Sequence, residues 1–297
     1  MRISIRASRG GDIWKLGDHF LMCGSSASSE DMARLFGQVE EQPLFVFTDP
    51  PYGVAVGSRN KAINEIDPGR GGRIEEDIAG DTMSFEDLRA MLTDAMGNLR
   101  EMCSDACSYY VSAPQGGDIV TMLEMMRDAG LPVRHNLIWV KSSAAFSMGR
   151  LDYDYQHEPI FYTWTKTHRW NGGYKTSVID DVKPLEKMNK SELKELVHAL
   201  RDGRGETSVI RADKPTASRL HPTMKPVKLV GRLMLNSSKE GDVVADVFGG
   251  SGTTLVAAEQ LGRRCLMMEL DPHYCDVIIE RWEQLTGKTA ERVSTNG

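Results

Sequence analysis

The chain has 297 residues, of which 40% are hydrophobic and 26% are charged, and its formal net charge at pH 7 is −6. That length and apolar content allow one large α/β domain or two small ones around a sizeable core, and the acidic balance argues against a protein that is basic over its whole surface. No apolar run approaches the roughly 18 to 20 residues that cross a bilayer, and the N-terminal segment lacks the apolar stretch of a signal peptide, so we expect a cytoplasmic protein without a membrane partner.

Short apolar runs alternate with amphipathic helical patterns, which is typical of βα units on a mainly parallel sheet. In the first half of the chain we expect strands over 44–48, 108–113, 137–141 and 159–164. Between the first two, apolar residues recur at three and four residue steps from Leu88 to Met102, so this segment is expected to be a covering helix with its methionines in the core and Ser84 as N-cap. A second helix is expected from Asp118 to about Ala129, ending at Gly130.

Two polar stretches interrupt this alternation. The segment 53–80 is rich in glycine and charge and shows no period, so we expect a long loop that is either functional or disordered. The segment 183–212 is a polar insert that contains one short amphipathic helix, 188–203. The C-terminal third then returns to a compact order, with a strand over 242–248, a glycine turn over 249–254, a helix over 255–262 and a strand over 263–270.

Positive charge is concentrated in two segments. Residues 201–232 contain eight Lys or Arg against three acids, and residues 131–175 contain six against three among many aromatic side chains. Such segments are either ordinary solvated faces or local patches for nucleic acid, and charge alone leaves both interpretations open.

Cysteine usage indicates reduced thiols and no metal site. The five cysteines form no CxxC pair, and their number is odd (Cys23, Cys103, Cys107, Cys265, Cys275). Cys103 and Cys107 stand at helical spacing, but no nearby histidine pair completes a zinc site, so we expect no metal.

The glycine turn in DVFGGSGTT lies between an apolar strand and a helix, an arrangement that places a ligand at the carboxyl end of a sheet. No lysine follows Gly252, as a P-loop requires, and the GxGxxG of a dinucleotide fold is incomplete. The shorter loop lets the backbone approach an uncharged or zwitterionic ligand, with Glu269 at the end of the next strand accepting hydrogen bonds from ribose hydroxyls. S-adenosylmethionine has such groups and no phosphate; a turn that only permits close helix packing is the alternative.

The sequence TDPPYG follows the first apolar strand directly. An aspartate there, with no lysine next to it in the sequence, is either a cap or a functional acid. The prolines fix the backbone, so the carbonyl of Pro50 and the carboxylate of Asp49 form two acceptors for one NH₂ group. Tyr52 offers a flat face for stacking, worth roughly 1 to 3 kcal/mol per base. Two acceptors favour a localised lone pair on an aromatic amino group and stabilise the positive charge that develops when it attacks a sulfonium methyl. A base inside a duplex must first be flipped out to reach such a site.

These motifs resemble those of the amino-methylating DNA methyltransferases of the DPPY type, and specifically the permuted β-class, in which the catalytic motif precedes the cofactor loop. Besides TDPPYG and the glycine loop, HPTMKP at 221–226 is similar to the family segment that closes over the cofactor, and NLIWVK and HEPIFYTW resemble its middle strands. The resemblance implies a Rossmann-like, S-adenosylmethionine-dependent methyltransferase domain over residues 1–297, with a mixed, mainly parallel sheet. It also implies a small target-recognition insert at about 166–220 and double-stranded DNA as substrate.

Carried over by position, the resemblance implies a set of site residues. The catalytic motif would be Asp49, Pro50, Pro51 and Tyr52, and the cofactor would be bound by Phe248, Gly250, Gly252, Thr253, Glu269, Thr223 and Lys225. Basic residues expected to contact DNA are Lys141, Arg150, Arg169, Lys175, Arg211 and Arg219. The chain departs from the family at Ser25, where relatives usually carry an acid after the glycine.

Several activities share this geometry. Aspartate at the first motif position favours adenine N6 over cytosine N4, whereas protein glutamine methyltransferases place the cofactor loop before their PPY motif. A DNA-binding protein that has lost catalysis is the alternative from another class, although neither motif is damaged. His135 and His157 are expected to be structural. The short insert predicts a short or relaxed recognition sequence; the resemblance also admits a homodimer and a cognate restriction endonuclease.

Overall fold

The computed structural model describes residues 8–52, 83–141, 155–171, 209–211 and 224–293. The expected loop at 53–80, the short helix at 188–203 and most of the expected target-recognition insert lie outside these residues. The strands are β1 (Ile13–Leu16), β2 (His19–Cys23), β3 (Phe45–Thr48), β4 (Ser108–Ser112), β5 (His135–Val140), β6 (His157–Trp164), β7 (Val209–Arg211), β8 (Val243–Asp246), β9 (Arg264–Glu269) and β10 (Glu291–Arg292). The helices are α1 (Ser29–Phe36), α3 (Phe85–Met102), α4 (Asp118–Asp128), α6 (Val227–Ser237), α7 (Thr253–Gln260) and α8 (Pro272–Thr286).

The described strands form one ten-stranded sheet in the order β10-β1-β2-β9-β8-β3-β4-β6-β5-β7. The segment from β2 to β4 is parallel throughout, while β1, β10 and β6 run antiparallel to their neighbours. This confirms the expected mixed, mainly parallel sheet, and the strand expected over 159–164 is its antiparallel member β6. The fold is that of an α/β protein of the Rossmann-like kind.

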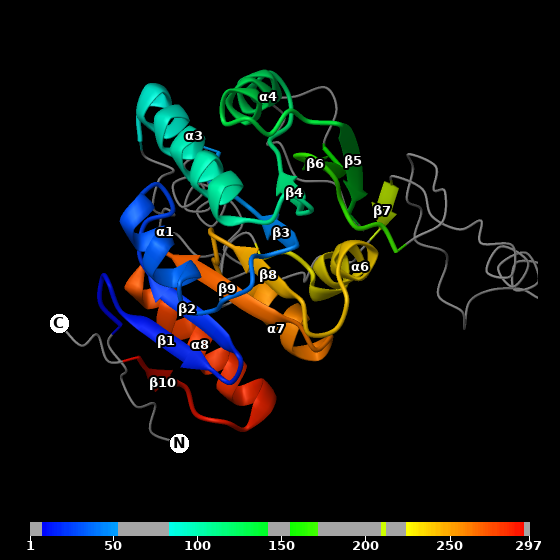
Figure 1. The fold of residues 1–297 in the computed structure, drawn as a ribbon. Coiled ribbons are helices and arrows are strands. Elements are labelled where there is room, and N and C mark those ends of the chain that lie inside the picture. The colour runs from blue at the N-terminus through cyan, green and yellow to red at the C-terminus, as the bar shows by residue number, and fades with distance from the viewer. Residues whose placement is uncertain (1–7, 53–82, 142–154, 172–208, 212–223, 294–297) are drawn as a thin grey trace, which may run out of the picture.

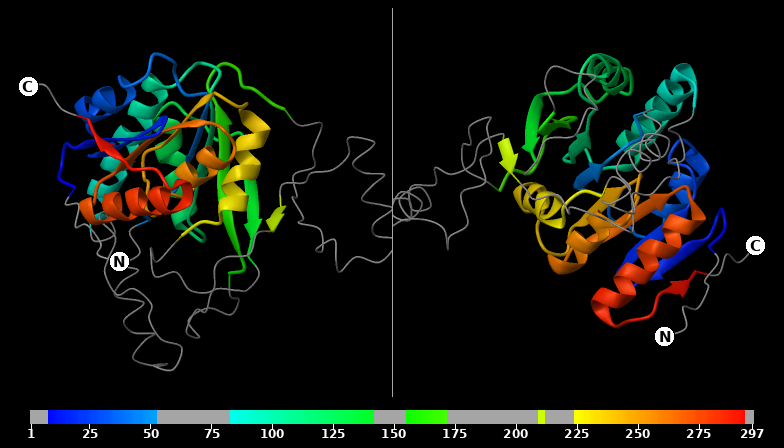
Figure 2. Two further views of the ribbon diagram at one scale, coloured as in Figure 1. Left: turned by 90° about the horizontal axis from the view of Figure 1, so that it is seen from below. Right: turned by 180° about the vertical axis from the view of Figure 1, so that it is seen from behind.

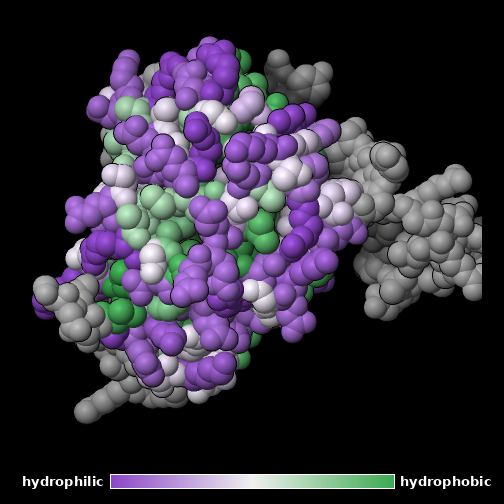
Figure 3. All heavy atoms as spheres, in the orientation of Figure 1, coloured by the Kyte–Doolittle hydropathy of each residue, from purple (hydrophilic) through white to green (hydrophobic). Residues whose placement is uncertain are grey.

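Helices cover both faces of the sheet (Figures 1 and 2). Helices α1, α3 and α4 contribute to one hydrophobic cluster, and α6, α7 and α8 contribute to the other. Because both faces are covered, the parallel strands β3 and β8 are buried at every position. Polar residues cover most of the face shown in Figure 3, interrupted by small hydrophobic areas. Within the described part of the chain, no helix combines the length and apolarity that a membrane span needs.

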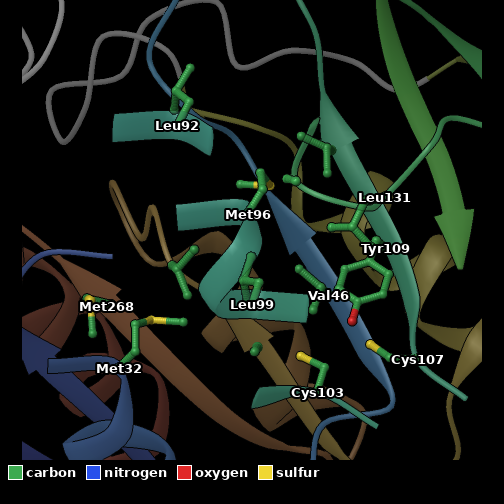
Figure 4. Packing of buried hydrophobic residues seen from close by; sticks show 14 of the residues in the cluster. Met32, Val46, Leu92, Met96, Leu99, Cys103, Cys107, Tyr109, Leu131 and Met268 are labelled. Carbon is green, nitrogen blue, oxygen red and sulfur yellow. The ribbon is translucent and has the colours of Figure 1, made fainter. Parts of the chain in front are cut away.

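Helix α3 shows how the sequence pattern becomes packing. Ser84 caps the helix, as expected, because its hydroxyl accepts a hydrogen bond from the Asp87 backbone N–H at 3.1 Å. The buried stripe of α3, which includes Met96, faces Val46 of β3 and Tyr109 of β4 (Figure 4). Met96 is completely buried, which confirms that it belongs to the core.

The structure also corrects the sequence interpretation. Helix α3 ends at Met102, so Cys103 is its C-cap and Cys107 lies beyond it. The two cysteines therefore do not lie on one helix, and the interpretation of their spacing as helical was wrong. The hairpin β1–β2 and the helices α1, α6 and α8 were not predicted. All five cysteines are buried and free.

The strand order places a topological switch point between β3 and β8. From β3 the chain passes through α3 to β4 on one side, and from β8 it passes through α7 to β9 on the other side. The two connecting helices lie on opposite faces of the sheet. Loops that leave such neighbouring strands at their carboxyl ends diverge, and α/β proteins bind ligands there. TDPPYG and the glycine turn are the segments that leave β3 and β8.

Candidate active site

The two sequence motifs meet at the carboxyl ends of β3 and β8. The strands pair in parallel, with Phe45 beside Val244 and Val46 beside Ala245. Two residues further on, the hydroxyl of Thr48 donates a hydrogen bond of 3.0 Å to Oδ1 of Asp246. The residues that begin TDPPYG and the glycine turn are therefore joined directly.

Asp246 holds the start of the glycine turn. Its Oδ1 also accepts from the backbone N–H of Phe248 at 3.2 Å, and its Oδ2 accepts from the hydroxyl of Thr254 at 2.6 Å. Burial raises the pKa of this carboxyl to about 7, and the hydrogen bonds from Thr254, Phe248 and Thr48 oppose that rise. Asp246 thus organises the loop and is itself inaccessible, with 4% of its surface exposed.

Glycine is required within the turn by backbone conformation and by space. Gly250 and Gly252 have φ values of 52° and 78°, in the left-handed region that favours glycine. A Cβ on Gly252 would lie 3.1 Å from the side chain of Ile278 in α8. The same helix carries Arg281, which donates a 2.7 Å hydrogen bond to the carbonyl of Ser251. The turn therefore packs closely against α8, as expected if its glycines only permit helix packing, which was the alternative to ligand binding.

Glu269 faces this turn from the end of β9. Its Oε2 accepts from the backbone N–H of Gly250 at 2.7 Å, and its Oε1 accepts from that of Asp271 at 2.9 Å. Burial raises the pKa of the carboxyl to about 7. Because each carboxylate oxygen has two acceptor sites, Glu269 keeps acceptor capacity for hydroxyl donors such as those of a ribose. These acceptor oxygens fit the ribose hydroxyls of S-adenosylmethionine, the cofactor that the sequence implied.

Asp49 lies on the other side of the switch point and is partly exposed, at 21% of its side-chain surface. Its Oδ1 accepts a 2.9 Å hydrogen bond from the hydroxyl of Tyr52. Burial raises the pKa of Tyr52 well above its usual value, with the charges of Asp49 and Glu158 adding to the effect, so the phenol stays neutral. Pro50 is buried and Pro51 is half-buried.

Lys225 contacts the second oxygen of Asp49, although no lysine is near Asp49 in the sequence. Its Nζ lies 2.5 Å from Asp49 Oδ2 and 3.4 Å from Glu158 Oε2. Burial lowers the pKa of this lysine, but the two carboxylates outweigh burial and raise it overall, so the ammonium stays charged. The carbonyl of Lys225 accepts a 3.1 Å hydrogen bond from the hydroxyl of Thr253, the first residue of α7. Lys225 therefore connects the glycine turn with Asp49.

The structure brings some of the predicted site residues together, whereas others lie apart or outside the described residues. It brings together the motif at 49–52, Lys225, the glycine turn with Phe248 and Thr253, and Glu269; Thr223 lies outside the described residues. Of the expected DNA contacts, Lys141 pairs with Glu158 at 2.5 Å and Arg169 pairs with Asp242. Arg211 is placed by its backbone in β7, beside Val140. Arg150, Lys175 and Arg219 lie outside the described residues, so DNA contact by these six residues stays a prediction.

Two further predictions concern Ser25 and the histidines. The backbone N–H of Ser25 donates a 3.0 Å hydrogen bond to Asp31 Oδ2, so a carboxylate from helix α1 stands beside this position. His135 stacks on the rings of Tyr162 and Trp164, and His157 meets Tyr155 edge-on, which agrees with structural roles.

Sequence reasoning assigned no role to Glu158 or Asp246. Both stood inside motifs that had been noticed, HEPIFYTW and DVFGGSG. The available signal was an acid at one terminus of an apolar strand within a motif, at the start of β6 for Glu158 and at the end of β8 for Asp246. The ion pair between Glu158 and Lys225 has no local signature, because 67 positions of sequence separate the two residues.

Comparisons with known proteins agree with this geometry. The profile of the N6_N4_Mtase family, described as DNA methylase, matches residues 44–280. The Type II methyltransferase M2.DpnII of Streptococcus pneumoniae is 23% identical over 241 residues, which are 80% of this chain and 81% of that protein.

Solved structures share the fold. The crystal structure of the M1.HpyAVI–SAM complex has a TM-score of 0.52 and 17% identity, covering 85% of this chain and 95% of that one. The cytosine-N4-specific PvuII DNA methyltransferase has a TM-score of 0.55 and 13% identity, covering 90% and 89%. The family match extends over most of the chain and includes both motifs of the site. The chain therefore belongs to the N6_N4_Mtase family of DNA methylases.

Proposed function

We propose that this protein transfers a methyl group from S-adenosylmethionine to the N6 amino group of adenine in double-stranded DNA. The observation that carries the proposal is the meeting of Asp49 with the glycine turn at the switch point between β3 and β8. An acceptor for an amino group and a loop that fits an adenosine-type cofactor thus lie side by side on rigid strands.

The catalytic motif would act by hydrogen bonding and stacking. The carboxylate of Asp49 and the carbonyl of Pro50 accept hydrogen bonds from the amino group of a flipped base, and these bonds stabilise the positive charge that develops on the nitrogen. Tyr52 supplies the stacking face, and its hydroxyl orients Asp49. No strong base is needed, because the amino nitrogen attacks the methyl group with its own lone pair. The C–S bond breaks and S-adenosylhomocysteine leaves, and the methylated, positively charged nitrogen is acidic enough to lose one proton to water.

The cofactor would be bound on the other side. S-adenosylmethionine supplies an electrophilic methyl group. The carboxylate of Glu269 would accept from the ribose, and Phe248 and the glycines would form the surrounding loop. The required left-handed turn, the backbone hydrogen bond from Gly250 to Glu269 and the Asp246 anchor support this assignment.

Cytosine N4 methylation is the second candidate, because one solved relative of the same fold is specific for that base. Asp49 at the first motif position favours adenine. The reaction geometry is the same for both bases, so the identity of the methylated nucleoside separates them.

We also propose that the protein acts in the cytoplasm with a short or relaxed recognition sequence, as the short insert predicts. A methylation map of DNA from cells that express the protein would contradict this if it revealed a long motif. Sedimentation of the purified protein tests for the homodimer that the resemblance admits, and a cognate endonuclease would reveal itself as cleavage that this methylation blocks.

The proposed activity is tested by incubating the protein with unmethylated plasmid DNA and tritiated S-adenosylmethionine. We expect label in the DNA with the wild-type protein and a loss of at least about a hundredfold with Asp49→Ala, because the amino group loses its charged acceptor. Undiminished transfer by the variant would refute the role of Asp49.

A further inference from the structure

Four charged side chains, Asp49 among them, form a largely buried cluster. This charge cluster consists of Asp49 after β3, Lys141 after β5, Glu158 in β6 and Lys225 before α6. Lys141 and Lys225 are 10% and 7% exposed, and Asp49 and Glu158 are 21% and 17% exposed. Burying charges costs several kcal/mol each, so stability alone is a weak reason for such a cluster. Clustered buried charges at a sheet edge are typical of a functional site.

The charges alternate in sign along a chain of contacts. Lys225 lies 2.5 Å from Asp49 and 3.4 Å from Glu158, and Glu158 lies 2.5 Å from Lys141. With two cations and two anions, the formal charge of the cluster is zero. Lys225 therefore reaches two carboxylates at once and stands closer to Asp49.

The contact between Lys225 and Asp49 conflicts with the proposed reaction unless another carboxylate can take the ammonium of Lys225. The amino nitrogen that hydrogen-bonds to Asp49 becomes positive during transfer, and an ammonium on the same carboxylate repels that charge. Lys225 also occupies an oxygen that the amino group needs. A second carboxylate within reach of Lys225 resolves both problems.

Glu158 is well placed to be that carboxylate. It stands in β6 beside Trp139 of β5, so the sheet fixes its backbone, and Lys141 at the end of β5 holds its other oxygen. The backbone of Lys225 is tied to Thr253. The flexible four-carbon stem of lysine can move the ammonium between Asp49 and Glu158 without any backbone movement.

We propose that Glu158 is a positioning residue that acts on Asp49 through Lys225. In the free protein, Lys225 pairs with Asp49; when a flipped base presents its amino group, Lys225 passes to Glu158 and Asp49 accepts the hydrogen bond from the base. The inference rests on the proposed amino-methylation at Asp49, and it adds the partner that frees this acid for the substrate.

The first test compares Glu158→Gln with the wild type in single-turnover methyl transfer to unmethylated plasmid DNA. Glutamine keeps the shape but removes the charge, so Lys225 stays on Asp49. We expect the rate constant to fall by about ten- to a hundredfold, while the dissociation constant for S-adenosylmethionine changes by less than about twofold. The matched control is Glu259→Gln, which removes another partly buried carboxylate, 25% exposed against 17% for Glu158, that binds His19 and Trp282 away from this cluster.

The second test uses the pH dependence of the same rate constant in Lys225→Met and Lys225→Arg. Without the ammonium, the carboxylates of Asp49 and Glu158 face each other, and repulsion between like charges raises the pKa of one of them. The methionine variant should therefore lose activity as the pH falls, at a higher pH than the wild type, and the arginine variant should restore the wild-type profile. Among the described residues, the other titratable groups that face these two carboxylates are Tyr52, Asp246 and Lys141, and all three are unchanged in these variants.

The double variant Glu158→Gln with Lys225→Met completes the cycle. Because it removes a cation and an anion together, its rate should be no lower than that of the slower single variant. The inference is overturned if Glu158→Gln transfers methyl at the wild-type rate, or if its affinity for S-adenosylmethionine falls in parallel with its rate. It is also overturned if the activity of Lys225→Met falls at the same low pH as that of the wild type. This second measurement tests the inference even if Glu158→Gln fails to fold. Absence of transfer by the wild type would instead refute the proposed function.

Discussion

Tyr52 contributes a ring and a hydroxyl, and substitutions can separate them. The ring offers a stacking face, and the hydroxyl donates to Asp49 at 2.9 Å. Because burial raises the pKa of this phenol well above its usual value, the group stays protonated and keeps donating throughout the pH range of an activity assay.

We expect Tyr52→Ala to raise the KM for DNA by about ten- to a hundredfold, since it removes base stacking worth roughly 1 to 3 kcal/mol. Tyr52→Phe keeps the ring and loses only the hydrogen bond to Asp49, so its KM should stay near the wild-type value and its kcat should fall by less than about tenfold. Steady-state kinetics with both variants measure this, and equal KM values for the two would argue against stacking.

We predict that Glu269 makes cofactor binding depend on pH. The raised pKa of about 7 means that the free carboxyl is partly protonated at neutral pH. Ribose hydroxyls donate best to the ionised form, so affinity for S-adenosylmethionine should increase as the pH rises from about 6 to 8 and then level off. Calorimetry at several pH values measures this. Glu269→Gln should bind more weakly and lose the dependence on pH; a variant that keeps the full dependence would place the titrating group elsewhere, for example at Asp246.

Residue types near the motifs were predictable, but contacts between distant segments were not. Asp49, Tyr52, Gly252 and Glu269 could be proposed as site residues because each lies within or at the end of a recognisable strand or turn. The pairing of Lys225 with Asp49 joins residues 176 positions apart. Ion pairs between distant segments leave no period or spacing in a sequence, so only the folded chain reveals them.

At the scale of elements, the glycine turn and helix α7 act as one unit. Gly252 is the N-cap of the helix and has a left-handed conformation. In the first turn of the helix, the hydroxyl of Thr254 donates a hydrogen bond to Asp246. The turn is thus held by its backbone conformation, by Asp246 and by α8.

Gly252→Ala should destabilise the protein by about 1 to 3 kcal/mol, because alanine is strained at positive φ and its Cβ would press on Ile278. The matched control is Gly97→Ala within α3, where a Cβ meets nothing within 4 Å. Removing a helical glycine there should stabilise by about 0.5 to 1 kcal/mol. Denaturant unfolding measures both free energies, and equal effects of the two substitutions would contradict the strained turn.

The prediction of elements succeeded where periodicity was long or the apolar run was pronounced. The four strands of the first half, α3, α4 and the β8–α7–β9 unit are present. The hairpin β1–β2 was missed although its sequence carried a signal, since Gly17 with its positive φ stands before Asp18 in a Gly-Asp turn that is typical of tight hairpins. Helix α8 had readable signals, since Asp271 caps it, Pro272 begins it and Gly287 ends it.

At the scale of the whole molecule, strand order creates the site. The order β9-β8-β3-β4 brings two motifs separated by about 200 residues to one switch point. The sequence predicted that each motif lies at the carboxyl end of a strand. That β3 and β8 are neighbouring strands depends on the packing of the whole sheet. The family resemblance supplied that expectation, and the structure gives its physical basis.

Because the cofactor would bind only the folded protein, it should stabilise the whole molecule. At a concentration a hundred times its dissociation constant, S-adenosylmethionine should add about 2.7 kcal/mol and raise the Tm by about 5 °C. Scanning calorimetry should show the same rise with Asp49→Ala, whose cofactor loop is intact, and little rise with Glu269→Ala. Loss of the rise in Asp49→Ala would contradict the division of the site into two halves.

The most direct test of the central claim combines methyl transfer with identification of the product. Unmethylated plasmid DNA is incubated with the protein and S-adenosylmethionine, digested to nucleosides and analysed by mass spectrometry, with Asp49→Ala in parallel. We predict N6-methyladenine with the wild-type protein and a near absence of it with the variant. N4-methylcytosine as the product would contradict the choice of base, and undiminished methylation by Asp49→Ala would contradict the proposed site.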